Sequence, residues 1–390
     1  MTETVNPEEL LRLRMIAQGL TGPGASTEPG DGDPRPRAAR IADTARRMLA
    51  VQGQDWRSAR FALGVRTPGT TVDDVHDAFN EGAIVRSWPM RGTIHVVAAE
   101  DIGWMQSVTN HRVLAGAAKR REFLGISDAM LDRLVETALE ALRDGASLDR
   151  DELAAAWSEA GLETQSNWRY HLIWWLCQNG LAVQGPVVNG GEPRLVSAPE
   201  WIPRPRELHG DEALAELAAR YASSRGAVSA RDLAWWTGLT AGESKRGLAH
   251  ASEAGRLVQV EASAGQKPVE LWADPASLDL LTTEARAPGW QLLPAFDEHL
   301  LGYQDRAAQL APEHFERIVP GRNGMFLATV LRRGRVVGTW RRGTRKGEGI
   351  LGSPLPGERF DPGLRELRRR TRDWAAFHGL GDTPFSVATG

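Results

Sequence analysis

One pattern occurs twice in this sequence, as Leu148-Asp-Arg-Asp-Glu-Leu-Ala-Ala-Ala-Trp157 and as Val228-Ser-Ala-Arg-Asp-Leu-Ala-Trp-Trp236. In each copy a polar residue caps a short helix, a glycine-leucine turn follows, and a second helix ends at a glycine before a strand. The turns are Gly161-Leu162 and Gly238-Leu239, and the strands begin at Gly180-Leu-Ala-Val-Gln184 and Gly255-Arg-Leu-Val-Gln-Val260. This order of helix, turn, helix and β-wing predicts a winged helix in each copy.

A third, more degenerate copy lies earlier, where Thr70–Phe79 precedes Gly82-Ala-Ile-Val-Arg86. From about Pro275 onward the chain changes to strand-like runs and ends in a basic helix over Pro362–His378. We therefore predict an α+β fold of three tandem winged-helix units followed by a C-terminal β-rich α+β domain. The expected domains are residues 1–125 (with a Gln-x-Gln motif), 126–203, 204–276 and 277–390 (with a basic hairpin).

Several shorter segments can also be assigned. Amphipathic helices are expected over Pro7–Gln18 and Arg37–Val51, and the Gly- and Pro-rich stretch Gly19–Pro36 between them predicts a surface loop. The runs Phe326–Leu331 and Val336–Trp340, joined by Arg332-Arg-Gly-Arg335, predict a β-hairpin. The second helix of the Leu148 copy is apolar on both faces, which favours a packing helix over a DNA-reading helix. We expect its Trp174 and Trp175, and likewise Trp235 and Trp236, in the core.

Composition limits the class of protein. The 390 residues are 42% hydrophobic and 25% charged, as in globular proteins with a sizeable core, and a single cysteine excludes an intramolecular disulfide. The N-terminus has no apolar signal region, and no stretch approaches the ~20 apolar residues of a membrane span. We expect a cytoplasmic protein.

Charge is distributed unevenly. The formal net charge is only −3, so a nucleic-acid partner cannot be inferred from the total. Lysine is rare, and the excess of arginine is explained most simply by GC-rich coding, although arginine also suits bidentate phosphate contacts. A local strip without acidic residues contains Arg332, Arg333, Arg335, Arg341, Arg342, Arg345 and Lys346.

Two triplets carry polar groups that could do chemistry. Glutamine is neutral and cannot serve as a general base at pH 7, so Gln52-Gly53-Gln54 on its chemistry alone indicates a polar helix end. Asp297-Glu298-His299 contains acid and base groups but lacks the His-Glu-x-x-His spacing of a zinc hydrolase, which favours a packed, hydrogen-bonded structural cluster. We expect no metal and no cofactor.

Four stretches together resemble the AlkZ/YcaQ-like winged-helix DNA glycosylases, in order along nearly the whole chain. They are Leu49-Ala-Val-Gln-Gly-Gln54, Val85-Arg-Ser-Trp-Pro-Met-Arg-Gly-Thr-Ile-His-Val-Val97, Leu293-Pro-Ala-Phe-Asp-Glu-His-Leu-Leu-Gly-Tyr303 and Val336-Val-Gly-Thr-Trp-Arg-Arg342. The family hallmark is a Gln-x-Gln or Gln-x-Asp motif, matched here by Gln52 and Gln54. Gly53 departs from the aliphatic residue that the family usually has between them.

The resemblance implies hydrolysis of the N-glycosidic bond of alkylated purines in double-stranded DNA, including the unhooking of interstrand crosslinks. Gln54 would position the attacking water, Gln52 would support the sugar or the same water, and Asp297 would be a supporting carboxylate. The chain would act as a monomer with an open cleft. Phosphate contacts are expected from Arg57, Arg86, Arg91, Lys119, Arg120, Arg121, Arg332, Arg333, Arg335, Arg341 and Arg342.

Two other interpretations stay open at this level. A non-enzymatic regulator could use the same winged helices with a vestigial glutamine pair, and palindromic operator binding by a dimer would favour it. An interaction scaffold without a DNA role is favoured by the net charge of −3. Absence of salt-sensitive duplex binding would support the scaffold.

Overall fold

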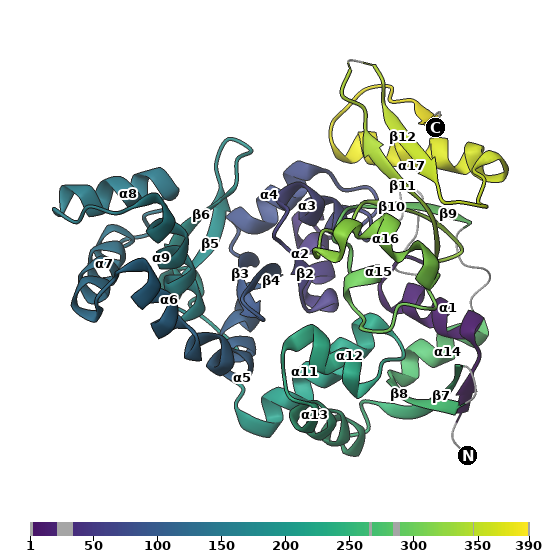
Figure 1. Ribbon diagram of the computed structural model, residues 1–390, viewed down its shortest axis with the longest axis horizontal. Helices are drawn as coiled ribbons and strands as arrows, with labels where there is room; N and C mark the ends of the chain where they lie inside the picture. Colours follow the sequence, from purple (N-terminus) through teal and green to yellow (C-terminus); the bar gives the residue numbers. More distant parts are fainter. Residues whose placement is uncertain (1–2, 22–33, 265–266, 284–288, 346, 389–390) are drawn as a thin grey trace. The chain divides into compact units, whose positions relative to one another are not determined.

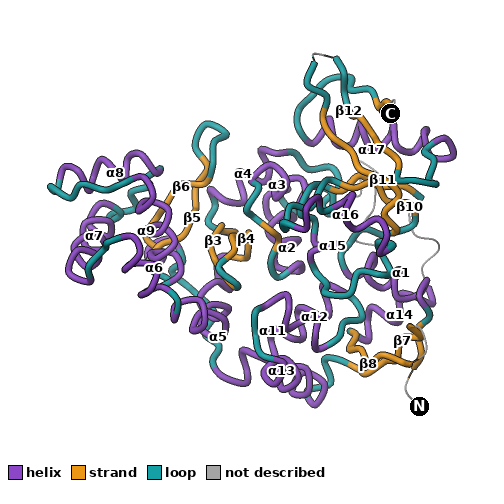
Figure 2. The backbone as a smooth tube through the Cα atoms, viewed as in Figure 1, coloured by secondary structure: helices purple, strands orange, loops and turns teal. Residues whose placement is uncertain are grey.

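The computed structural model describes residues 3–21, 34–264, 267–283, 289–345 and 347–388 (Figure 1). Most of the predicted loop Gly19–Pro36, namely residues 22–33, and Lys346 of the basic strip lie outside these ranges. Helices and several sheets are combined, as the α+β prediction requires (Figure 2). The chain divides into two compact units, Met1–Val75 with Leu214–Gly390, and His76–Ala213.

The unit His76–Ala213 contains the Leu148 copy of the repeat. Its hairpin β3–β4 turns at Arg91 and Gly92, which both have positive φ (51° and 65°), as a two-residue turn requires. Strands β4, β3, β5 and β6 follow one another in a sheet. Helix α4, Val72–Asn80, leads into this unit, whose elements are β3 (Ile84–Met90), β4 (Thr93–Ala98), α5 (Ile102–Ala115), α6 (Ala117–Leu124), α7 (Asp128–Ala141), α8 (Arg150–Glu159), α9 (Ser166–Gln178), β5 (Ala182–Val187), β6 (Pro193–Ser197) and α10 (Ala198–Trp201).

The other unit contains the Val228 copy, and the N-terminal strand joins its sheet. Strand β1 pairs in parallel with β7, which pairs with β8 in an antiparallel hairpin. The elements up to this point are β1 (Glu3–Val5), α1 (Pro7–Ala17), α2 (Arg37–Met48), β2 (Val51–Gln52), α3 (Trp56–Gly64), α11 (Gly210–Arg225), α12 (Ala230–Thr237), α13 (Ala241–Glu253), β7 (Val258–Ala264), β8 (Lys267–Ala273) and α14 (Pro275–Thr283).

The C-terminal segment of the same unit forms a five-stranded sheet in the order β13-β12-β11-β10-β9. The predicted hairpin is confirmed as β10–β11, and the predicted basic helix is α17. The elements are β9 (Trp290–Leu293), α15 (Glu298–Leu301), α16 (Phe315–Ile318), β10 (Thr329–Arg332), β11 (Arg335–Arg342), β12 (Ile350–Pro354), α17 (Leu364–Phe377) and β13 (Phe385–Val387).

The two clear copies of the repeat have the same local structure. Both begin with a capping box, at Asp149 before α8 and at Ser229 before α12. In both, the residue before the cap pairs with the second wing strand, Leu148 with Leu195 and Val228 with Trp272. The helix-turn-helix and hairpin order is therefore confirmed for these copies. In the degenerate copy the order β2, α3, α4, β3, β4 is comparable, and its assignment as a winged helix stays a prediction.

Tryptophans occupy much of the core, but not all of those expected there are buried. Trp236 is fully buried, as are Trp88, Trp104 and Trp157. Trp174, Trp175 and Trp235 are only partly buried. Helix α9 buries Leu172, Leu176 and Cys177 against the core, which agrees with a packing role, but it leaves part of its aromatic surface accessible. Among the described residues, no helix is both long and apolar enough to cross a bilayer.

Candidate functional site

The Gln-x-Gln motif follows a strained turn. The predicted helix over Arg37–Val51 ends early, at Met48, because Leu49 has φ 62° and ψ −54°. The Ala50 N–H donates to the Met48 carbonyl at 2.7 Å, which closes a γ-turn around Leu49. This conformation is unfavourable for a residue with a side chain, and the complete burial of Leu49 holds it in place. The motif is therefore not a helix end: Gln52 closes the short strand β2.

Gln52 and Gln54 have different environments. The Gln52 Oε1 accepts hydrogen bonds from the backbone N–H groups of Gly53 at 2.9 Å and Gln54 at 3.2 Å. Its carbonyl oxygen thus folds back and shapes the loop. Gln54 is exposed, and the next residue, Asp55, caps helix α3 by accepting from the Ser58 N–H at 2.6 Å. The loop therefore presents the Gln54 side chain to solvent, directly before a capped helix.

A buried carboxylate holds this loop by its backbone. Glu298, only 1% exposed, accepts the Gln52 N–H on Oε1 at 3.1 Å. Its Oε2 accepts from Arg225 at 2.7 Å and from the Trp236 indole N–H at 3.0 Å. Both oxygens are therefore engaged, and the charge of Glu298 is neutralised by a buried guanidinium.

Arg225 also holds the strained turn itself. Its guanidinium donates to the carbonyls of Met48 and Ala50, each at 3.1 Å, which flank Leu49. The guanidinium lies 4.9 Å from the centre of the Trp236 ring. One buried ion pair thus fixes the chain before the motif through Arg225 and the motif's own backbone through Glu298.

The neighbouring Asp297 makes a second buried ion pair. Arg66 binds its two carboxylate oxygens at 2.7 and 2.8 Å, and Arg66 also donates to Gln18 at 3.0 Å. Burial alone would raise the pKa of Asp297, but Arg66 and the His299 N–H hold the pKa below its usual value. Gln18 in turn donates to the Tyr303 hydroxyl at 2.9 Å, and Tyr303 donates to the Arg225 carbonyl at 2.7 Å. This chain of bonds links the two ion pairs.

The triplet Asp297-Glu298-His299 is thus the packed, hydrogen-bonded cluster that its spacing suggested. Asp297 bonds to Arg66 and caps α15; the carboxylate that contacts the motif is its neighbour, Glu298. The His299 Nε2 donates to the Gly334 carbonyl at 2.7 Å, and burial lowers the pKa of His299 to about 4. His299 is therefore neutral at pH 7. In the parts of the chain that the structure describes, no three His, Cys, Asp or Glu side chains form a group able to hold a metal.

Basic side chains gather beside the helix that follows Gln54. Phe61 of α3 packs edge-on against Trp340 of β11, with ring centres 6.3 Å apart, and against His378 after α17. Burial lowers the pKa of His378, and the nearby charges of Arg60 and Arg342 lower it further. Burial also lowers the pKa of Arg60, and the nearby charge of Arg57 contributes to that decrease. Arg57, Arg60 and Arg342 therefore share one positively charged region of this unit.

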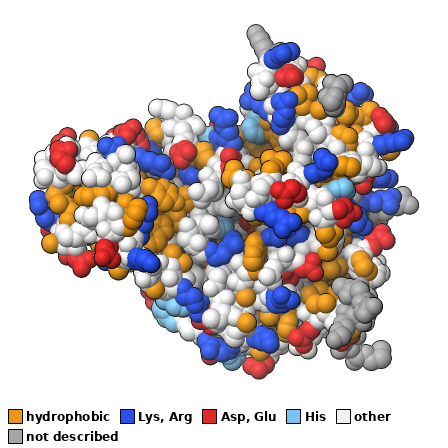
Figure 3. Space-filling view, in the orientation of Figure 1, with side chains coloured by type: hydrophobic (Ala, Val, Ile, Leu, Met, Phe, Trp, Pro, Cys, Tyr) orange, Lys and Arg blue, Asp and Glu red, His pale blue; other side chains and the backbone are white. Residues whose placement is uncertain are grey.

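The basic strip is divided between two turns. The β10–β11 turn is packed down: Gly334 lies against Leu11 and Met15, and its carbonyl accepts from His299. Arg332, Arg333 and Arg335 around it are exposed. Arg341 and Arg342, also exposed, lie at the other end of β11, where the chain continues into the β11–β12 hairpin. Figure 3 shows Lys and Arg side chains over this second hairpin.

The other expected phosphate contacts lie in the unit His76–Ala213 and differ in exposure. Arg86 does not fit the expected role, because it is only 3% exposed and pairs with Glu192 at 2.9 Å. Arg121 is engaged too, with Asp128 at 3.1 Å and over the Trp175 ring at 4.8 Å. Arg91 is half-buried in the β3–β4 turn. Lys119 and Arg120 on α6 are exposed.

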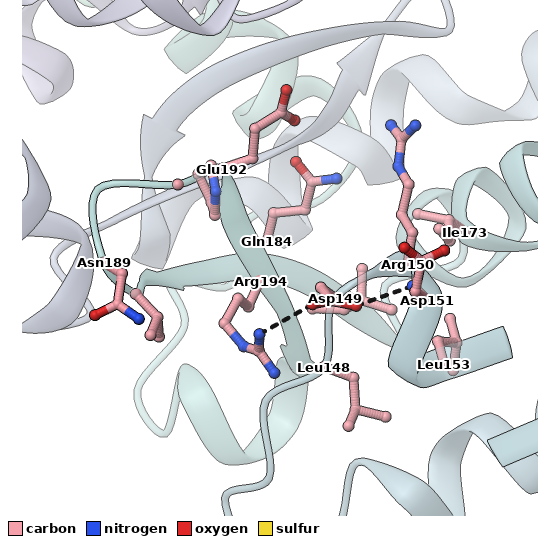
Figure 4. Close-up of a pocket in the computed structure, with 14 residues that line it drawn as sticks. Leu148, Asp149, Arg150, Asp151, Leu153, Ile173, Gln184, Asn189, Glu192 and Arg194 are labelled. Atoms are coloured by element: carbon pink, nitrogen blue, oxygen red, sulfur yellow. Dashed lines mark hydrogen bonds and ion pairs between the residues drawn. The ribbon is translucent and has the colours of Figure 1, made fainter. Parts of the chain in front are cut away.

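A pocket of about 540 Å³ lies beside the β5–β6 hairpin, and several of the charged side chains that line it are paired. Arg194 reaches Asp149 at 3.4 Å (Figure 4). It also pairs with Glu152. Glu192, which also lines the pocket, forms an ion pair with Arg86. Neither Gln52 nor Gln54 lines it, so this pocket is not part of the Gln-x-Gln site.

Comparison with known proteins decides the family. The family model described as "DNA glycosylase AlkZ-like" matches residues 45–377, which include the motif, the buried ion pairs and the β11–β12 hairpin. The chain belongs to the AlkZ-like DNA glycosylase family. A curated relative, the interstrand DNA cross-link repair glycosylase of Streptomyces sahachiroi, is 24% identical over 309 residues, which are 76% of this chain and 81% of the relative.

The fold agrees with that of a solved AlkZ-like glycosylase. The structure of Streptomyces sahachiroi DNA glycosylase AlkZ superposes with a TM-score of 0.76 at 19% sequence identity, over 99% of this chain and 100% of that chain. The superposition therefore covers the whole architecture. The AlkZ-like fold accounts for the mixed helices and sheets described above.

Sequence reasoning missed the residues that hold the AlkZ-like motif. These residues are far apart in the sequence: Arg225 ends α11, Trp236 lies in α12, and Gln18 follows α1. No local pattern links them to Gln52. A weak signal exists for Arg225, which directly precedes the Gly226 turn at the start of the Val228 copy. The signal for Glu298 was stronger, because it lies in the triplet singled out for its acid and base groups.

Proposed function

We propose that this protein hydrolyses the N-glycosidic bond of N7-alkylated purines in double-stranded DNA, including purines joined in interstrand crosslinks. The family supplies the glycosylase activity. The crosslink is suggested by the name of the Streptomyces sahachiroi relative. The observation that carries the proposal is the exposed Gln54 on a loop whose backbone is fixed by the buried Glu298–Arg225 pair.

The chemistry suits a neutral amide. An N7-alkylguanine is cationic in DNA and leaves as a neutral base, so its departure needs no strong general acid. What the site must supply is a water held at the anomeric carbon and stabilisation of an oxocarbenium-like sugar. The Gln54 carbonyl can orient that water by accepting a hydrogen bond from it. Consistent with this, Asp297 and Glu298 are both committed to arginines, and neither serves as the proton donor.

Gln52 takes a supporting part in this proposal. Because its Oε1 binds the N–H groups of Gly53 and Gln54, it sets the direction in which Gln54 leaves the backbone. Its amide NH₂ group is then the end that can reach the sugar or the same water. Rigid placement matters, since a misplacement of about 1 Å can cost roughly 10²-fold in rate.

The DNA backbone would be held by the charged region beside the motif. Arg57, Arg341 and Arg342 are exposed cations within the unit that contains Gln54, and Lys119 and Arg120 are exposed in the other unit. Arginine forms bidentate bonds with phosphate. Binding should weaken steeply with salt, with a slope of log K against log salt near −0.9 per phosphate contact.

Release of free N7-methylguanine from a duplex containing one such base tests the function, measured by chromatography of the released base. Wild-type protein should release the base and leave an abasic site, and Gln52→Ala and Gln54→Ala should release it much more slowly. Gln304→Ala, at an exposed glutamine outside the site, is the matched control and should behave as wild type. If wild type releases no base from either this duplex or one with an N7-linked interstrand crosslink, the proposal fails, and salt-sensitive duplex binding would then favour the DNA-binding regulator over the interaction scaffold.

A further inference from the structure

A second pocket, in the unit His76–Ala213, has no part in the reaction proposed above. Its volume is about 310 Å³, at the small end of pockets that hold small molecules. Helices α5, α6 and α9 line it, with Val113 on α5, Arg120 on α6, and Tyr170, His171 and Trp174 on α9. The walls therefore combine three aromatic rings with one cation.

The aromatic rings are arranged for stacking at the surface. His171 and Trp174 stack with centres 5.3 Å apart and planes 22° apart. Tyr170 is 47% exposed and meets Trp88 edge-on, which fixes its ring against the core. Figure 3 shows hydrophobic side chains gathered at the surface over α6 and α9. An exposed aromatic surface with a polar rim is a feature of ligand and macromolecule binding sites.

The wall also contains an unsatisfied polar atom. Burial, together with the nearby charges of Arg120 and Arg121, lowers the pKa of His171 to about 4, so its imidazole is neutral at pH 7. His171 is only 5% exposed, and its Nε2 has no hydrogen-bond partner among the described residues. A buried polar atom without a partner is uncommon, and the polar edge of a bound ring would supply one. Arg120 lines the same pocket, so its charge lies on the wall that holds His171.

The position of the pocket in the repeat points to its ligand. Helix α9 is the second helix of the Leu148 copy, the helix that meets DNA in helix-turn-helix proteins. Its sequence is too apolar to read base edges, yet its start leaves Tyr170 exposed in a pocket that Arg120 also lines. Aromatic rings next to basic side chains are the means by which proteins bind unstacked bases, because every base has a π-face and carries a phosphate nearby.

We propose that this pocket holds an unstacked nucleobase of the bound DNA, with the base against Tyr170 and Trp174 and its phosphate on Arg120. The inference rests on the proposed function only in taking DNA as the partner. The base concerned is undamaged, because stacking does not require alkylation. Such a site would retain a base that has left the stack of the bound DNA.

Binding to undamaged DNA tests the pocket directly. The probe is a labelled duplex with one 2-aminopurine, either paired with thymine or unpaired opposite an abasic-site analogue. Stacking contributes about 1–3 kcal/mol per base, so wild type should bind the unpaired probe about fivefold or more tightly than the paired one. Binding should also quench the fluorescence of the unpaired 2-aminopurine. Affinity is measured by fluorescence anisotropy of the label.

Matched variants distinguish the contributions of the Tyr170 ring and the Arg120 charge to binding of the unpaired probe from general affinity for DNA. Tyr170→Ala should abolish the preference for the unpaired probe, and Tyr170→Phe, which keeps the ring, should retain it. Arg120→Gln should weaken binding of the unpaired probe more than Lys119→Gln, which removes an equal charge that does not line the pocket. A wild-type protein that binds both probes equally, or a preference that survives Tyr170→Ala, would overturn the proposal. Failure to release a base from both the N7-methylguanine duplex and the crosslinked duplex would reject the proposed function alone, since the binding assay contains no lesion.

Discussion

Three helices in this chain, α3, α8 and α12, begin after a short extended segment, and the three starts are held differently. Before α8, Leu148 exchanges two backbone hydrogen bonds with Leu195, at 2.9 and 2.8 Å, and the next residue is the cap. Before α12, Val228 does the same with Trp272, at 3.0 and 2.8 Å. Before α3, two residues, Gly53 and Gln54, separate Gln52 from the cap Asp55.

The difference shows how a structural repeat can acquire a reactive loop. At α8 and α12 the chain passes directly from a backbone bridge into the capped helix, which leaves no polar side chain between them. At α3 the two additional residues expose Gln54, and a side-chain carboxylate, Glu298, binds the Gln52 N–H. A longer loop is more mobile, so its placement depends on the buried Glu298–Arg225 pair.

Breaking the buried Glu298–Arg225 pair should have the largest effect on stability. Glu298→Gln keeps an oxygen for the Gln52 N–H but leaves the Arg225 charge buried without its partner, which should lower the free energy of unfolding by about 3–5 kcal/mol. Denaturant titration measures this. Glu316→Gln, in an exposed pair with Arg322, is the control and should cost at most about 1 kcal/mol. Equal costs for the two variants would mean that the pair does not anchor the loop.

Acid should weaken the same cluster through His299. The pKa of His299 is lowered to about 4 in the folded state, against about 6.5 in the unfolded chain, so only the unfolded chain takes up this proton as pH falls from 6.5 toward 4. At pH 5 this amounts to a loss of roughly 2 kcal/mol relative to pH 7. His299→Gln should lack this part of the decline. Parallel pH profiles for the two proteins would show that His299 is not the group responsible.

A milder change separates loop placement from folding. Trp236→Phe removes one hydrogen bond to Glu298 Oε2 and leaves the Arg225 bond in place, at a cost of about 1 kcal/mol in stability. We expect a lower single-turnover excision rate with unchanged affinity for DNA. A loss of affinity with an unchanged rate would place Trp236 at the DNA interface and remove it from the support of the loop.

The smallest effect concerns the two turns of the basic strip. Neutralising Arg341 and Arg342 together should reduce the salt slope of duplex binding by about 0.9 per lost phosphate contact. Neutralising Arg332 and Arg333, beside the turn packed against Leu11 and Met15, should change the slope less. Affinity measured at several salt concentrations distinguishes the pairs. A larger change for Arg332 and Arg333 would make the β10–β11 turn the DNA-binding one.

Local signals in the sequence predicted the repeated elements well. Capping residues at Asp149 and Ser229 lie within a few residues of the helices that they start, so the pattern is visible along the chain. The predicted end of α2 at Val51 was wrong, because the positive φ of Leu49 depends on burial and on Arg225, which is remote in sequence. The motif itself was found through the family resemblance, since glutamine chemistry alone indicated only a polar helix end.

The residues that hold the Gln52 loop could not be predicted either, because they are remote from it in the sequence. Gln52 and Glu298 are 246 positions apart, and their bond forms only when β2 and α15 pack together. Asp297 was expected as a supporting carboxylate, whereas the adjacent residue makes the contact. Which of two neighbouring carboxylates faces the motif depends on the capping geometry of α15, where Asp297 bonds to the His299 N–H.

The most direct test of the account compares the three helix starts in one experiment. Single-turnover release of N7-methylguanine is measured for Gln54→Ala, Asp149→Ala and Ser229→Ala beside wild type. We predict that Gln54→Ala lowers the rate by roughly 10²–10³-fold, as expected for loss of a positioned polar group. The two cap variants should lower stability by about 1 kcal/mol and leave the rate near that of wild type. A Gln54→Ala protein that releases the base at the wild-type rate would contradict the central claim.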